Sequence, residues 1–116
     1  MAITQGTTCT LPLRYMKIIP EHAKIEVTFN QPNKQLTKRN EEDGGIYYEP
    51  IMDKIGQTQI GTKIYVDLSQ EDTLYFNPGP TEVQIRYIDE EGDTKASGIA
   101  IEKWEKILKK GVIKYE

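Results

Sequence analysis

The chain has 116 residues, of which 37% are apolar and 28% charged, and its net charge at pH 7 is −3. This size suits one globular domain and is too small for two, and no apolar run reaches the roughly 18 residues that a membrane-spanning helix needs. A single cysteine excludes an internal disulfide, and a single histidine all but excludes a histidine-rich metal site.

The N-terminus reads MAITQGTTCT, with neither a basic start nor an apolar stretch, so we expect no signal peptide. Residues 1–8 carry few core side chains, and we expect them to form a flexible arm. The rest of the chain, to residue 116, is predicted to be one domain. The lone Cys9 is typical of a protein made in a reducing compartment.

Apolar residues that alternate with polar ones predict strands along most of the chain. The clearest runs cover residues 24–30 (KIEVTFN), 63–68 (KIYVDL) and 81–89 (TEVQIRYID). Weaker patterns cover residues 8–15, 35–38, 46–52 and 95–101. Turn-forming residues separate these runs at 31–33, 42–45, 77–80 and 89–93, with Gly92 expected in the left-handed region. Together they predict an all-β fold, an antiparallel immunoglobulin-like β-sandwich of about seven strands.

One or two short helical turns are expected beside the strands. Ser69 is a good N-cap with Asp72 three residues later, which predicts a helical turn that bridges two strands on opposite sheets. Near the end, Ile101, Trp104 and Ile107 recur at helical spacing before Gly111. We expect residues 102–116 to form a C-terminal helical turn or an extended arm, in preference to a last core strand.

Charge is unevenly distributed along the chain. Residues 1–40 carry six Lys or Arg against two Asp or Glu, residues 41–93 carry three against thirteen, and residues 94–116 carry six against three. An acidic middle disfavours binding to nucleic acid, which needs clustered positive charge. Segments of opposite charge favour head-to-tail contact between copies. Alternatively, the acidic middle consists only of ordinary solvated turns.

Catalytic chemistry has few candidates in this sequence. Cys9 and His22 are the only thiol and imidazole, thirteen residues apart and without an evident orienting group, so we predict no catalytic residues and no cofactor. Two acidic runs, at 41–43 and 89–93, have the oxygen ligands that calcium prefers but not the spacing of an EF-hand. We predict no metal site, and calcium binding by these loops stays an open alternative.

Seven tyrosines and one tryptophan suggest a binding surface. Tyr47 and Tyr48 are adjacent, so one of them must point away from the core of a strand, and Tyr65 is expected on an outer face. Such tyrosines suit a protein interface, a carbohydrate-binding or adhesion module, or simply the outer face of a sheet.

The run at residues 68–100, LSQEDTLYFNPGPTEVQIRYIDEEGDTKASGIA, followed by ILKKGVI at 107–113, resembles small virion-associated proteins of tailed phages and prophages in Gram-positive bacteria. These proteins are similar to the N-terminal domain of phage baseplate upper proteins. The resemblance implies a non-enzymatic structural protein of a tail, neck or baseplate. It also implies a location in the virion, or in the bacterial cytoplasm before assembly.

The same resemblance implies assembly through strand edges and both terminal segments. Its partners would be other copies and neighbouring virion proteins, not nucleic acid or a membrane. The expected contact residues are Trp104, Ile107, Leu108, Val112, Tyr47 and Tyr48. Alternatively, Trp104 and its neighbours cover an open end of the sandwich. Two rival functions are a sugar-binding module that uses outer-face tyrosines and a small inhibitor of a host protein.

Overall fold

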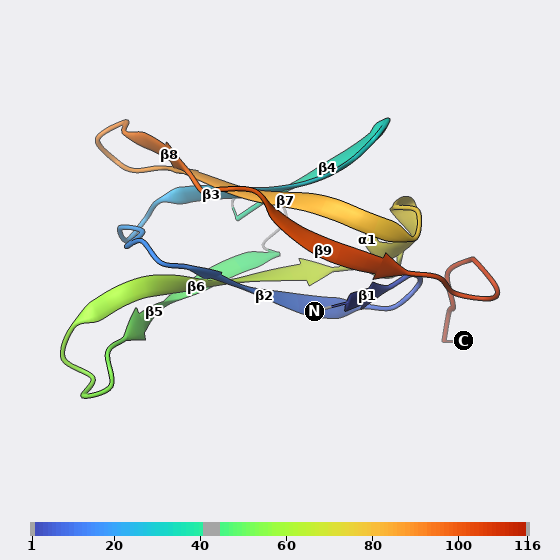
Figure 1. Cartoon of the computed structure of the whole chain (residues 1–116), viewed down its shortest axis with the longest axis horizontal. Helices are drawn as coiled ribbons and strands as arrows, with labels where there is room; N and C mark the ends of the chain where they lie inside the picture. Colours follow the sequence, from blue (N-terminus) through green and yellow to red (C-terminus); the bar gives the residue numbers. More distant parts are fainter. Residues whose placement is uncertain (1, 41–44, 116) are drawn as a thin grey trace.

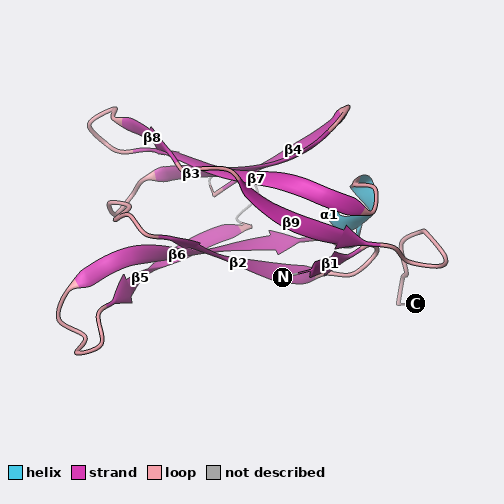
Figure 2. Cartoon of the chain, in the orientation of Figure 1, coloured by secondary structure: helices cyan, strands magenta, loops and turns pink. Residues whose placement is uncertain are grey.

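The computed structural model describes residues 2–40 and 45–115, which form two facing layers of strands (Figure 1, Figure 2). Nine strands and one helix lie within these residues: β1 (Ala2–Thr4), β2 (Cys9–Tyr15), β3 (Lys24–Gln31), β4 (Lys34–Arg39), β5 (Ile46–Met52), β6 (Gln59–Leu68), α1 (Gln70–Tyr75), β7 (Gly79–Ile88), β8 (Thr94–Ala96) and β9 (Ala100–Glu105).

The strands form two sheets. The larger sheet has the order β1-β9-β7-β3-β4, with β8 also paired to β7, and the smaller sheet has the order β2-β6-β5. Pairs between these strands are antiparallel, except that β1 runs parallel to β9. The chain passes from one sheet to the other four times, which is the connectivity of an immunoglobulin-like sandwich. The predicted all-β sandwich is therefore confirmed.

The strand count exceeds the expected seven for two reasons. β1 was not expected, and the weak pattern at 95–101 corresponds to two separate strands, β8 and β9. Between them Ser97 interrupts the ladder, because its amide donates to the carbonyl oxygen of Ile85 and its hydroxyl accepts from the amide of Ile85. Gly92 has a φ of 91° in the hairpin before β8, as the turn chemistry predicts.

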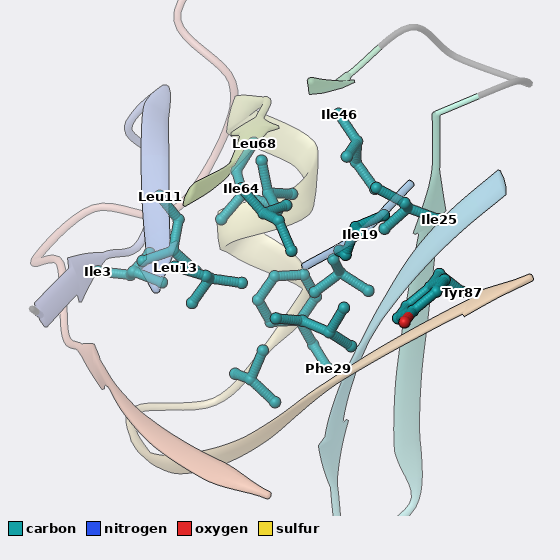
Figure 3. Packing of buried hydrophobic residues seen from close by; sticks show 14 of the residues in the cluster. Ile3, Leu11, Leu13, Ile19, Ile25, Phe29, Ile46, Ile64, Leu68 and Tyr87 are labelled. Atoms are coloured by element: carbon teal, nitrogen blue, oxygen red, sulfur yellow. The ribbon is translucent and has the colours of Figure 1, made fainter. Parts of the chain in front are cut away.

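Alternating side chains build the core between the sheets. β3 buries Ile25, Val27, Phe29 and Gln31, while the side chains between them lie on its other face and are half-buried. In Figure 3, Leu11 and Ile64 of the smaller sheet point into the same interior as Ile25 and Phe29 of the larger sheet. This arrangement follows from a period of two in both sheets.

Helix α1 connects the two sheets and begins as its sequence predicts. Ser69 is the N-cap: its hydroxyl accepts from the amide of Asp72, and the Asp72 carboxylate accepts from the amide of Ser69. This capping box satisfies two amides that have no partner within the helix. The helix follows β6 and precedes β7, so it bridges the two layers, as expected.

Both chain ends differ from the expected arms. Residues 2–4 form β1, with Ile3 buried, because pairing with β9 gives their backbone groups partners. Gln5 is also buried, and its amide nitrogen donates to the carbonyl oxygen of Phe76. At the other end, residues 102–105 belong to β9 and only residues 106–115 lack regular structure. Trp104 accounts for this difference, because pairing with β7 and β1 turns its ring into the core.

Candidate functional site

The thiol and the imidazole lie at opposite ends of strand β2. Cys9 begins this seven-residue strand and lines a hollow with Lys38 and Asp67. His22 lies in the loop after the strand and lines a different hollow. Burial raises the pKa of the Cys9 thiol, and the Asp67 carboxylate raises it further. The structure therefore does not bring Cys9 and His22 together as a nucleophile and its base.

The acidic hairpin at 89–93 uses a carboxylate to shape its own turn. The Asp89 carboxylate accepts hydrogen bonds from the amides of Glu91 and Asp93, at 3.0 and 2.9 Å. Within the described residues, no group of three or more His, Cys, Asp or Glu side chains is placed to hold a metal ion. The other acidic run, at 41–43, lies outside the described residues.

The two adjacent tyrosines face opposite ways, as the strand geometry requires. Tyr47 points outward and is 50% exposed. Tyr48 points inward against the core, and its hydroxyl donates to the carbonyl oxygen of Pro20. Tyr65 is also on the outer face, directly across from Tyr47 in the register of β5 and β6. The outer face of the smaller sheet thus carries Tyr47 and Tyr65, while Tyr48 contributes to packing.

Tyr65 already has partners on its ring. Tyr47 stacks on it with 4.9 Å between ring centroids and an interplanar angle of 18°. The Lys63 ammonium lies 5.3 Å from the same ring's centroid, and the hydroxyl donates to Glu49. The hydroxyl's bond to Glu49 is the main cause that raises the pKa of Tyr65. These contacts cover part of the Tyr65 ring, so less of its surface is free for a sugar to stack on.

Trp104 is a core residue, not a surface contact. Its side chain is 1% exposed and packs edge-on against Phe76 and Phe29, at centroid distances of 5.0 and 5.8 Å. The assignment of Trp104 as an interface residue is therefore corrected, in favour of the alternative that it closes one end of the sandwich. Ile107 is half-buried, and its Cδ1 lies beside Gly6.

The segment 106–115, called the tail below, presents apolar side chains to solvent. Leu108 is 96% exposed, Val112 and Ile113 are also exposed, and so is Tyr115. The tail is held to helix α1 by the Gln70 amide group, which donates to the carbonyl oxygen of Ile113 and accepts from its amide nitrogen. Leu108 and Val112 thus lie on an accessible surface, as an interface role requires.

A second apolar surface lies at the opposite end of the molecule. This "loop end" consists of the loops at 16–23, 53–58 and 89–93, which all lie on the left in Figure 1, away from the C-terminus. In or beside these loops, six large apolar side chains are exposed: Met16, Ile18, Met52, Ile55, Ile60 and Ile88. They were not among the expected contact residues, because the local sequence pattern does not show that they share one surface.

Contacts with the strands hold these loops at one end of the molecule. Met16 lies over Gly61 on β6, and Thr62 bonds to the loop backbone by accepting from Ile19 and donating to Lys17. On the other side, the first residue of β3 pairs with Ile88, which precedes the acidic hairpin. A hollow of about 370 Å³, lined by Ile19, Tyr48 and Pro50 among others, opens between the loop at 16–23 and strands β5 and β6.

Strand edges are poorly suited to pairing with another chain. Pro12 and Pro50 stand on β2 and β5, the two edge strands of the smaller sheet, and neither can donate a backbone hydrogen bond. The β4 edge of the larger sheet carries three Lys or Arg residues, and β1 is only three residues long. Proline, charge and short length all oppose edge-to-edge association, so the expectation of contact through strand edges is not favoured.

No protein-family model matches the chain, and no significant similarity was found to the curated proteins or to the solved structures. Within the described residues, no helix has the length and apolar character needed to cross a membrane.

Proposed function

We propose that this protein is a non-enzymatic structural component of a phage or prophage particle, in its tail, neck or baseplate, and acts through protein contacts. One observation carries the proposal. Of the fourteen exposed large apolar side chains in the described part of the chain, ten lie in the tail or at the loop end. Scattered apolar residues are normal on a surface, whereas gathered ones mark interaction sites.

The placement of these residues also supports an assembly role. The molecule is about 47 Å long, and its tail and loop end occupy opposite ends of it (Figure 1). A protein with a contact surface at each end can join two neighbours. Resemblance of residues 68–100 and 107–113 to phage virion proteins supports placing those neighbours in a particle.

Particle composition tests this proposal. Particles released by the phage or prophage that encodes the chain should contain it after density banding, as measured by mass spectrometry. A deletion of the coding sequence should yield particles with a defective tail, neck or baseplate in electron micrographs, and the wild-type sequence in trans should restore them. Complete, infectious particles that lack the chain would overturn the proposal.

A rival function makes a different prediction. A sugar-binding module would bind glycans and would lose that binding when Tyr47 is changed to alanine. We expect no glycan binding that depends on Tyr47, because one face of the Tyr47 ring is already covered by Tyr65.

A further inference from the structure

We propose that copies of this chain associate head to tail, with the tail of one copy docked on the loop end of the next. The inference rests on the proposed assembly function and names the partner as a second copy. It rests on the chemistry of the two ends, which both expose apolar side chains and carry opposite charges.

The tail is basic and apolar. Lys106, Lys109, Lys110 and Lys114 give residues 106–115 a charge of +4, with no acidic residue among them. Leu108 and Ile113 are 96% and 78% exposed. A segment that exposes this much apolar surface gains free energy when a partner removes that surface from water.

The loop end is acidic and apolar. Its three loops hold six acidic residues against Lys17 and Lys54, which gives them a charge of −4. Four of the six acids lie in the hairpin at 89–93, while the neighbouring Lys24 and Lys95 lie in the strands that carry the loops. Opposite charges of equal size at the two ends favour the encounter of a tail with a loop end and oppose contact between like ends.

The loop end also has a place for an apolar side chain. The hollow beside Ile19, Tyr48 and Pro50 is bordered by the exposed Met16 and Ile18 loop. Its volume of about 370 Å³ exceeds that of one aliphatic side chain. Leu108 or Ile113 of another copy therefore has space to enter.

The geometry decides the symmetry of the contact. The tail and loop end of one molecule lie at opposite ends of its long axis, so a molecule cannot dock its tail on itself (Figure 1). The contact joins two different surfaces, and repeated use of it produces a closed ring or a filament. Both surfaces are small, so we expect a weak contact, with a dissociation constant on the order of 10 μM or higher.

Charge reversal in two complementary variants tests the contact. One variant carries K109E and K110E, and the other carries E90K and E91K; all four side chains are exposed. Each variant alone should associate at least about tenfold more weakly than the wild type, because like charges then meet. An equal mixture should associate again, since each altered end meets its complement in the other variant. Analytical ultracentrifugation up to about 0.5 mM measures this, and circular dichroism checks that each variant is folded.

A second mixture tests the direction of the contact. A chain with L108S, K109Q and K110Q keeps its loop end but has a disabled tail. The E90K and E91K variant has the opposite combination, a wild-type tail and an altered loop end. In a mixture of the two chains, the wild-type tail of one can bind the acidic loop end of the other, and association should stop at a pair. The wild type should instead form species larger than a dimer at the same concentration.

The outcomes separate this inference from the proposed function. Wild-type chain that stays monomeric at about 0.5 mM, or variants that all associate as the wild type does, would overturn the head-to-tail contact. The chain would still be a particle component if mass spectrometry finds it in banded particles. Conversely, if the chain associates head to tail but is absent from particles, the contact stands and the particle assignment is overturned.

Discussion

The indole nitrogen of Trp104 donates a hydrogen bond of 2.8 Å to the carbonyl oxygen of Thr73 and thereby ties the last strand to helix α1. Thr73 is itself buried, and its hydroxyl donates to the carbonyl oxygen of Thr7. Three segments far apart in the sequence, β9, α1 and the turn after β1, therefore meet at this point. The end of the sandwich from which the tail leaves is closed by these contacts.

Replacement of Trp104 should therefore be strongly destabilising. We expect Trp104→Ala to lower the free energy of unfolding by about 3–5 kcal/mol, because a large cavity forms beside Phe29 and Phe76. The exposed Leu108→Ala variant should change it by less than about 0.5 kcal/mol. Urea denaturation measures both, and similar stabilities for the two variants would contradict the core assignment.

Truncation distinguishes the strand from the tail. A chain that ends at Ile101 lacks Trp104 and most of β9, so β1 loses its pairing partner, and we expect it not to fold. A chain that ends at Leu108 keeps β9 and the bond from the Ile107 amide to Gln5, and should fold. Amide chemical-shift dispersion in NMR spectra separates the two cases. A folded chain ending at Ile101 would show that β9 is dispensable.

The sequence predicted the sandwich because its strongest signals are local. The alternation in β3, β6 and β7 and the capping box at Ser69 depend only on nearby residues. Residues 102–105 of β9 were missed because their pattern is set by distant partners. Ile101 and Trp104 are three residues apart, which suggests a helix, yet pairing with β7 and β1 places them on opposite faces of a strand.

The candidate surfaces were predictable only in part. Leu108 and Val112 were expected at the surface because the end of the chain has little core of its own, and both are exposed. Met16 and Ile55 were missed because local patterns give no reason for apolar residues in turns. Their common location becomes evident only when the sheets bring the loops at 16–23 and 53–58 to one end (Figure 1).

Gly61 should be essential for seating the loop at 16–23. A Cβ at this position would lie 2.9 Å from the carbonyl oxygen of Tyr15 and 3.3 Å from the Cα of Met16, so the backbone would have to move. We expect Gly61→Ala to cost about 1–3 kcal/mol of unfolding free energy. Gly98→Ala is the matched control, because a Cβ there meets nothing within 4 Å. Thermal denaturation compares them, and equal midpoints would refute the close approach.

Cys9 should react slowly as a nucleophile in the folded protein. Burial and the Asp67 carboxylate both raise the pKa of its thiol, so less thiolate is present near neutral pH than in the unfolded chain. Iodoacetamide should alkylate Cys9 more slowly in buffer than in denaturing urea at the same pH. Asp67→Asn removes the second cause and should speed alkylation of the folded protein. A thiol that reacts faster when folded would indicate an activated nucleophile instead.

Asp53 should make the β5–β6 hairpin sensitive to acid. A hydrogen bond from the Gln57 amide is the main cause that lowers the pKa of Asp53, and the amides of Thr58 and Gly56 lower it further. Because the folded-state pKa lies below the unfolded-state value, this carboxylate stabilises the fold above the unfolded pKa, about 3.9 for Asp. That stabilisation is lost as the pH falls through the folded-state pKa.

The difference in unfolding free energy between the wild type and Asp53→Ala should therefore shrink from pH 5 to pH 2, roughly the range over which free and hydrogen-bonded carboxyls titrate. Chemical denaturation at several pH values measures this difference, and a value independent of pH would show that the carboxylate charge does not support the turn.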